Sequence, residues 1–249
     1  ICACLVGSEM CIRDRMIGKS SVAITDALEA DKVAGGGVFV HFDNISGKKA
    51  EVYVDTEVHN SGKRTRTVAV ETVLADAGDV PVKRVSQQVK LQAGESKTVR
   101  QRFAVRNPKL WSPDSPYLYR IQSRVKAGHE VLDGGVTRVG IRKAEFKGKD
   151  GFWLNGKPFG QLVGANRHQD FAYVGNALPN SQQWRDAKRL RDAGCTIIRV
   201  AHYPQDPAFM DACDEMGLFV IVATPGWQYW NKNPEFAKLV PVSYTHLRA

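Results

Sequence analysis

The sequence predicts two structural parts in one chain, an antiparallel β-sandwich followed by parallel β/α units. The first observation is a series of short segments between residues 35 and 143. In these segments apolar and polar residues alternate, and turn residues recur roughly every 8–12 positions. The second observation is a change after residue 144, where continuous apolar runs alternate with helix-like segments. Alternation is typical of strands with one solvated face, and continuous apolar runs are typical of parallel strands covered by helices.

The sandwich strands are expected where the alternation is regular. Around residues 51–59, for example, Val52, Val54, Thr56 and Val58 fall on one face. The full set of expected strands is 38–42, 51–59, 67–74, 82–91, 98–105, 117–125 and 134–142. Residues 108–116 form a loop that carries Trp111. We therefore place a sandwich domain at residues 35–143, preceded by a remnant or linker at 16–34.

Charge and hydropathy exclude two classes of partner. The net charge is +9, but the basic residues are spread through the strand-like segments and no nucleic-acid recognition motif accompanies them. Several of these residues occupy outward positions of the alternation, which predicts a solvated sheet face: Arg64, Arg66, Arg100, Arg102 and Arg124. No apolar run approaches the roughly 18 residues of a membrane span. We expect neither a nucleic-acid nor a membrane partner.

Neither the cysteines nor the chain ends point to a site. The five cysteines have neither metal-ligand spacing nor the pattern of a secreted disulfide framework, so no metal or cofactor is expected from them. Residues 1–15 and 241–249 resemble translated sequencing-adapter sequence, and their patterns do not continue into their neighbours. We expect both tails to pack poorly.

The second part, residues 144–240, begins with a hairpin and continues with strands and helices. Residues 151–158 read as a hairpin with an Asn155-Gly156 turn. Continuous apolar strands are expected at 162–165, 196–201 and 218–223. The signals that bound the two intervening helices are Ser181 and Asp206 as N-caps, Pro207 at a first helical position, and Gly194 and Gly217 as stops.

Two folds begin with this β/α alternation, the doubly wound sheet and the (β/α)8 barrel. The first βα turn has no glycine fingerprint for a dinucleotide, which favours the barrel. In both folds the ligand site lies at the carboxyl ends of the strands. Two polar clusters fall there, at residues 166–168 and 202–204, and each contains a histidine.

The motifs together resemble one enzyme family. They are Gly140-Ile141-Arg142, residues 152–158 (FWLNGKP), 164–168 (GANRH), 198–204 (IRVAHYP) and 214–218 (DEMGL). Residues 109–119 (KLWSPDSPYLY) complete the set. In this order the chain resembles the glycoside hydrolases of family 2, with the β-galactosidase branch closest. The resemblance implies an immunoglobulin-like β-sandwich followed by the first three βα units of an incomplete TIM barrel.

The resemblance also implies a substrate site. His168, Arg199 and His202 match residues that surround the sugar in the −1 subsite of the family, and Asn166 is a further candidate. Arg167 is read either as part of the site or as a structural ion-pair partner. Trp227 could stack on a sugar ring, as could Tyr229 and Trp230, but all three could equally pack against the rest of a barrel.

The function implied by the resemblance is that of a retaining exo-glycosidase of carbohydrate metabolism, acting on terminal β-glycosidic bonds. Such enzymes use two glutamates at the ends of later barrel strands, so no catalytic residue is expected in this chain, which alone should be inactive. Many β-galactosidases hold magnesium through a glutamate after the third strand. The matching residues here, 222–225 (VATP), include no carboxylate, so we expect no metal. The alternative is a non-catalytic carbohydrate-binding or adhesion module built on the sandwich.

Overall fold

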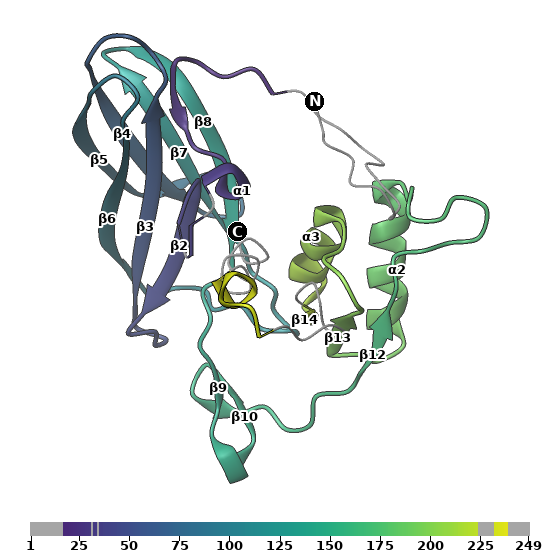
Figure 1. Cartoon of the computed structure of the whole chain (residues 1–249). Coiled ribbons are helices and arrows are strands. Elements are labelled where there is room, and N and C mark those ends of the chain that lie inside the picture. The colour runs from purple at the N-terminus through teal and green to yellow at the C-terminus, as the bar shows by residue number, and fades with distance from the viewer. Residues whose placement is uncertain (1–16, 31, 34, 224–231, 239–249) are drawn as a thin grey trace. The chain divides into compact units, whose positions relative to one another are not determined.

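The computed structural model describes residues 17–30, 32–33, 35–223 and 232–238. Both adapter-like tails, 1–15 and 241–249, lie outside the described residues. The described chain divides into two compact units, one of residues 19–161 with 232–238 and the other of residues 162–223 with 17–18 (Figure 1).

The first unit contains a sandwich of two antiparallel sheets, as the alternating pattern predicts (Figure 1). In one sheet β3 is central, with β6 along one edge and β1 and β2 in succession along the other. The other sheet has the order β5-β4-β7-β8. The strands of the first sheet are β1 (Val22–Ile24), β2 (Val38–Asp43), β3 (Lys49–Asn60) and β6 (Ser96–Arg106). Those of the second are β4 (Arg66–Ala75), β5 (Pro81–Leu91), β7 (Tyr119–Ala127) and β8 (Glu130–Val139).

The core of the sandwich lies between the two sheets. The inward residues Val52, Val54, Thr56 and Val58 are fully buried, which confirms the face assigned from their period of two. They meet inward residues of the facing sheet such as Leu74, Ile121 and Val125. All seven strands expected from alternation are present, within a few residues of their expected bounds.

One strand of the sandwich comes from the stretch that the sequence pattern assigned to a remnant or linker. β1 pairs with the end of β3, and its residues are buried against the second core cluster. The short helix α1 (Ala27–Ala30) follows it. Residues 16–34 are therefore not all linker. A strand of three residues is too short to display alternation, which is why its sequence gave no signal.

Trp111 joins two of the sequence motifs to the sandwich core. Its backbone N–H donates to the Ile141 carbonyl over 2.9 Å, and the Arg142 guanidinium lies 4.8 Å from its ring centroid. Gly140 faces the indole so closely that a Cβ there would lie 2.9 Å from ring carbons. The Asn155 side chain donates to the Trp111 carbonyl over 3.0 Å. The tryptophan is 1% exposed, so these contacts form a packed joint between the motifs.

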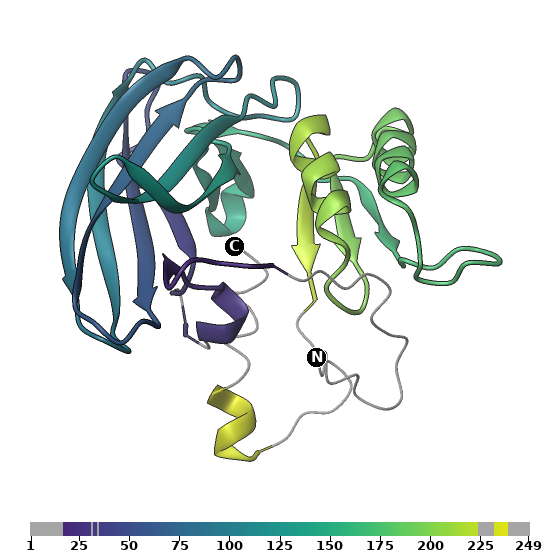
Figure 2. The same cartoon turned by 90° about the horizontal axis from the view of Figure 1, so that it is seen from above.

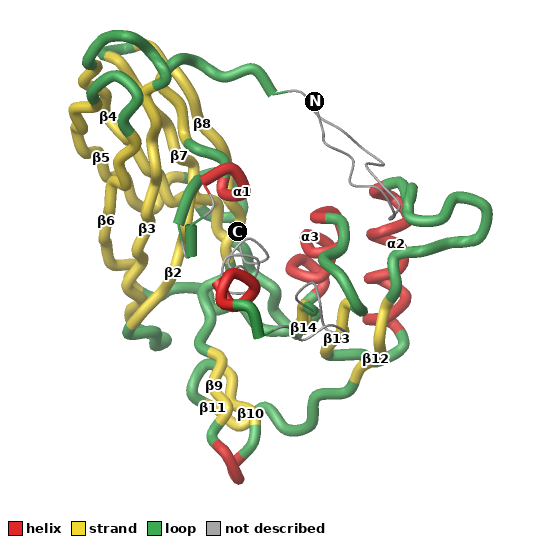
Figure 3. The backbone as a smooth tube through the Cα atoms, in the orientation of Figure 1, coloured by secondary structure: helices red, strands yellow, loops and turns green. Residues whose placement is uncertain are grey.

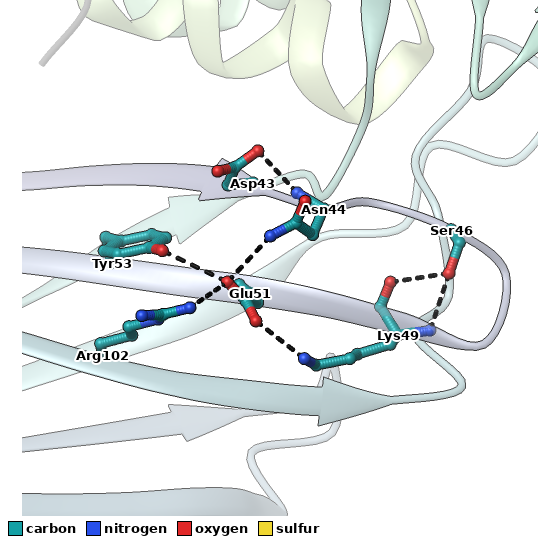
Figure 4. Close-up of polar contacts among 7 residues, drawn as sticks. All are labelled: Asp43, Asn44, Ser46, Lys49, Glu51, Tyr53 and Arg102. Carbon is teal, nitrogen blue, oxygen red and sulfur yellow. Dashed lines mark hydrogen bonds and ion pairs between the residues drawn. The ribbon is translucent and has the colours of Figure 1, made fainter.

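A charged cluster centred on Glu51 lies on the outward face of the first sheet (Figure 4). The Glu51 carboxylate accepts hydrogen bonds from Lys49, Arg102 and Asn44, and also from the Tyr53 hydroxyl. The hydrogen bond from Lys49, followed by those from Arg102 and Asn44, lowers the pKa of Glu51 to about 2. This arrangement agrees with the expected solvated face, where outward arginines pair with neighbouring carboxylates.

A small antiparallel sheet follows the sandwich. It contains β9 (Ala144–Phe146), β10 (Phe152–Leu154) and β11 (Lys157–Pro158), with a single 3-10 turn, η1 (Gly148–Asp150), between the first two. The predicted Asn-Gly turn joins β10 to β11, and both turn residues have positive φ, 53° at Asn155 and 79° at Gly156. Two consecutive positive φ angles are typical of the tight turns that match the twist of a hairpin.

The second unit is a parallel sheet of order β12-β13-β14 with two helices, as the βα pattern predicts (Figures 2 and 3). Its elements are β12 (Gly164–Arg167), α2 (Asn180–Asp192), β13 (Ile197–Val200), α3 (Pro207–Met216) and β14 (Phe219–Val222). Ile198 and Val200 face Ala187 of α2 and Phe209 of α3 in one buried cluster. Both helices therefore cover the same face of the sheet.

The helix boundaries agree with the sequence signals at three positions of four. Asp206 caps α3 by accepting from the Ala208 N–H over 2.8 Å. Gly194 and Gly217 follow the helices with left-handed φ angles of 86° and 74°. Ser181, however, is not the N-cap of α2, since Pro179 occupies that position and its carbonyl accepts the first hydrogen bonds of the helix. Proline has no side-chain cap, so composition alone favoured the serine nearby.

Candidate functional site

The carboxyl ends of β12 and β13 lie side by side. Asn166 is the register partner of Arg199, which is in turn the partner of Ile221 on β14. Ile198 and Val200 face the helices, so the alternation places Arg199 on the opposite, helix-free face of the sheet. Its laterally paired neighbour Asn166 occupies the same face. In a closed barrel this face would line the interior.

A glycine permits the close approach of the two strands. A Cβ at Gly164 would overlap the carbonyl oxygen of Ile197 and would lie 2.7 Å from its carbonyl carbon. Any side chain at this position would push β12 away from β13. The first residue of the Gly-Ala-Asn-Arg-His motif is therefore a packing requirement for the strand pair.

The two histidines meet just beyond the strand ends. The ring centroids of His168 and His202 are 5.3 Å apart, with the planes at 78°, so the rings stand edge to face. Desolvation, followed by the charges of Arg199 and His168, lowers the pKa of His202 below its usual 6.5. The lowered pKa favours the neutral form of His202, in which one ring nitrogen can donate and the other can accept.

These positions bring four of the five predicted site residues to one edge of the sheet. His168 and His202 are in ring contact, and Arg199 and Asn166 occupy paired positions on the adjoining strands. Such a group can donate hydrogen bonds to hydroxyls and can hold a carboxylate ionised through Arg199. The fifth candidate, Trp227, lies outside the described residues, as do Tyr229 and Trp230.

Arg167 faces the other way and has a structural partner. It is 6% exposed, and its guanidinium donates over 2.8 Å to Asp186 of α2. The guanidinium carbon also lies 3.9 Å from the ring centroid of Phe209 on α3. Of the two readings of Arg167, the ion-pair partner is the one that matches these contacts.

Sequence reasoning gave no role to Tyr203, which also contributes to this edge. Its ring centroid lies 6.4 Å from that of His168, and its hydroxyl accepts from the Gln169 N–H over 2.9 Å. The sequence signal that could have identified Tyr203 is its position between His202 and Pro204 in the second polar cluster.

Among the described residues, no group of three or more His, Cys, Asp or Glu side chains is arranged to hold a metal ion. Within the same residues, no helix combines the length and the apolar character that crossing a membrane requires.

Comparison with known proteins identifies both parts of the chain. The family "Glycosyl hydrolases family 2" matches residues 37–142, and the TIM barrel domain of the same family matches residues 145–239. Together these matches cover most of the chain and include every motif discussed above.

Among curated proteins, the chain is 36% identical over 193 residues to a β-galactosidase of Thermoanaerobacter pseudethanolicus, covering 77% of this chain and 25% of that protein. It is 33% identical over 211 residues to a putative β-glucuronidase of Formosa agariphila, covering 81% of this chain and 25% of the relative. The chain thus spans about a quarter of the length of these relatives.

A solved structure shows the same architecture. A glycosyl hydrolase family 2 member from Bacteroides cellulosilyticus superposes with a TM-score of 0.78 at 30% identity, covering 92% of this chain and 31% of that one. The immunoglobulin-like sandwich followed by the start of a TIM barrel is therefore the fold of this chain.

Proposed function

The chain belongs to the glycosyl hydrolases of family 2, and from this premise we propose that it supplies part of the sugar site of a retaining β-glycosidase. The proposed reaction is hydrolysis of a terminal β-glycosidic bond. By complete enzyme we mean a polypeptide that extends this chain by the remaining strands of the barrel. The glycosidase names of the matched relatives favour this function over a non-catalytic binding module.

The observation that supports the proposal best is the edge-to-face pair of His168 and His202 beside Arg199. A glycosidase transition state develops oxocarbenium character, and hydrogen bonds to the sugar hydroxyls strengthen as it forms. The imidazole of His202, whose pKa is lowered, suits this task because in its neutral form one nitrogen donates and the other accepts. In the proposed enzyme, Arg199 holds a neighbouring catalytic carboxylate ionised.

The two catalytic carboxylates are proposed to come from later barrel strands. Retention of configuration requires two carboxyl groups about 5–5.5 Å apart. Glu215 does not fit such a role, because it lies in the last turn of α3 and the chain then enters β14 from that end. The C-terminal end of α3 therefore lies at the edge of the sheet opposite to the one that carries the histidines. We propose that the 249-residue chain alone is inactive for this reason.

For the substrate we propose a β-galactoside first and a β-glucuronide second, since relatives carry both names. Residues 222–225 offer no carboxylate for a magnesium ion, so we propose that this segment contributes no metal ligand. The site residues of this proposal are His168, Arg199, His202 and Asn166, with Trp227 as a further candidate.

The test is a comparison of nitrophenyl β-galactoside, β-glucuronide and β-mannoside as substrates of the complete enzyme and of this chain alone. The complete enzyme should hydrolyse one of them with retention, and the chain alone should hydrolyse none. Absence of turnover by the complete enzyme on every β-glycoside would overturn the proposed function. Turnover by the purified chain alone would overturn the assignment of the catalytic carboxylates.

A further inference from the structure

The loops that carry His168 and His202 are joined by hydrogen bonds centred on Arg167. The Arg167 carbonyl accepts from the Ala201 N–H over 2.9 Å and from the Gln205 side-chain amide over 2.7 Å. Arg167 precedes His168, and Ala201 precedes His202. The residues just before the two histidines are therefore hydrogen-bonded to each other.

Gln205 completes a reciprocal pair with Arg167. While its amide nitrogen donates to the Arg167 carbonyl, its amide oxygen accepts from the Arg167 guanidinium. The same guanidinium donates over 2.8 Å to Gln183 and to Asp186, both on α2. The arginine thus fixes the loop after β13 to the end of β12 and also to the helix behind the sheet.

A second connection lies on the other side of His168. The Gln169 N–H donates to the Tyr203 hydroxyl over 2.9 Å, and the Gln169 side-chain oxygen accepts from the Asp206 N–H. His168 is thus flanked on both sides by residues bonded to the loop of His202. An edge-to-face geometry of two rings on separate loops depends on such connections.

Stability alone does not explain a buried arginine here. Replacing a buried ion pair with apolar side chains of similar volume is often neutral or stabilising. Arg167 instead directs a rigid set of donors at three acceptors, one of which is on the His202 loop. What it provides that an apolar side chain could not is a fixed position for that loop.

We propose that Arg167 and Gln205 are positioning residues, which hold the rings of His168 and His202 in the relative positions that binding of the sugar requires. This inference rests on the proposed function for its catalytic consequence, but not for its geometric one. A displacement of about 1 Å in a positioned group can lower a rate about a hundredfold. The hydrogen bonds of Arg167 and Gln205 therefore influence the rate of hydrolysis without contacting the substrate.

The first test uses this chain and needs no activity. In the wild type, NMR should show cross-peaks between the His168 and His202 rings, and His202 should titrate below pH 6.5. Gln205→Ala should abolish the cross-peaks and move the His202 pKa toward 6.5, because the ring regains solvent. The matched control is Lys188→Ala, which removes an exposed ion pair with Asp192 on α2 and should change neither signal.

A second variant addresses folding. Gln205→Glu keeps the length of the side chain and still accepts from Arg167, but it cannot donate to the carbonyl. We expect a folded protein with the same loss of ring contact as Gln205→Ala. Retention of the wild-type cross-peaks and titration in both variants would overturn the positioning role.

The second test measures kcat and KM of the complete enzyme. Gln205→Glu should lower kcat about tenfold or more with little change in KM, because the donors remain present but are misplaced for the transition state. Wild-type kcat in a variant that has lost the ring contact would overturn the catalytic part of the inference. If the wild-type enzyme hydrolyses no β-glycoside, the proposed function fails, and the NMR result still decides the geometry.

Discussion

Replacing Gly164 with alanine should separate the strand pair that carries the site. The new Cβ would lie 2.7 Å from the Ile197 carbonyl carbon and 2.9 Å from its Cγ2. Ordinary carbon contacts are about 3.5–4.0 Å, and the Cβ would also overlap the Ile197 carbonyl oxygen, so β12 must move by more than about 1 Å. Hydrogen bonds between the strands, such as Thr196 N to Val163 O at 2.7 Å, cannot survive that shift.

The size of the effect follows from the bonds lost. Losing about three hydrogen bonds at roughly 1 kcal/mol each costs about 3 kcal/mol of local stability. Alanine also lowers the conformational entropy of the unfolded chain, which stabilises the folded protein by about 0.4–1 kcal/mol. The net loss of about 2–3 kcal/mol should speed amide exchange roughly 30- to 100-fold, since about 1.4 kcal/mol is a factor of ten.

The assay is native-state hydrogen exchange at the Ala201 amide, which donates to Arg167 across the strand pair. The matched control is Gly135→Ala, at a strand glycine of β8 whose Cβ would meet nothing within 4 Å. Exchange at Ala201 should rise in the first variant and stay unchanged in the second. Equal exchange rates in the two variants would refute the steric argument.

Three further predictions concern stability and surface. The stability advantage of the wild type over Glu51→Gln should shrink as pH falls below 4.5 and disappear near 2, because the folded state holds that pKa at about 2. Urea unfolding at stepped pH measures this, and a constant difference would contradict it. Gly140→Ala should cost about 1–3 kcal/mol by overpacking against Trp111, visible as a lower sandwich Tm; an unchanged Tm would contradict the contact. Ile221, 50% exposed, lies on the helix-free sheet face that a closed barrel would cover, so the whole chain should bind more hydrophobic dye than residues 19–161 alone, which also expose apolar side chains such as Phe146 at 79%. Equal dye binding would count against this.

The sandwich was predictable because its signal is local and repeated. Inward residues such as Val52 and Val54 recur at a period of two over long strands, and the turns between them contain glycine or asparagine. β1 was missed because three residues cannot show a period. Capping preference is a composition rule and favours Ser181, whereas the chain path at Pro179 decides where α2 begins.

The candidate site was predictable only in part, for a similar reason. His168 and His202 were placed together because parallel strands end at one edge, which is a property of topology. The link between Arg167 and Gln205 joins residues 38 positions apart through side-chain atoms. No periodicity or motif encodes such a contact, so it becomes visible only once the loops are folded.

The central claim is that His168 and His202 face a sugar in its transition state. The most direct measurement is the affinity of the complete enzyme for two ligands, free galactose and a planar cationic galactose mimic. A ligand that resembles the transition state gains more binding affinity than the product does from side chains that contact the transition state. His202→Ala should weaken binding of the mimic about tenfold or more while changing galactose affinity much less, and Lys188→Ala should change neither. Equal affinities of the wild type and His202→Ala for the mimic would contradict the account.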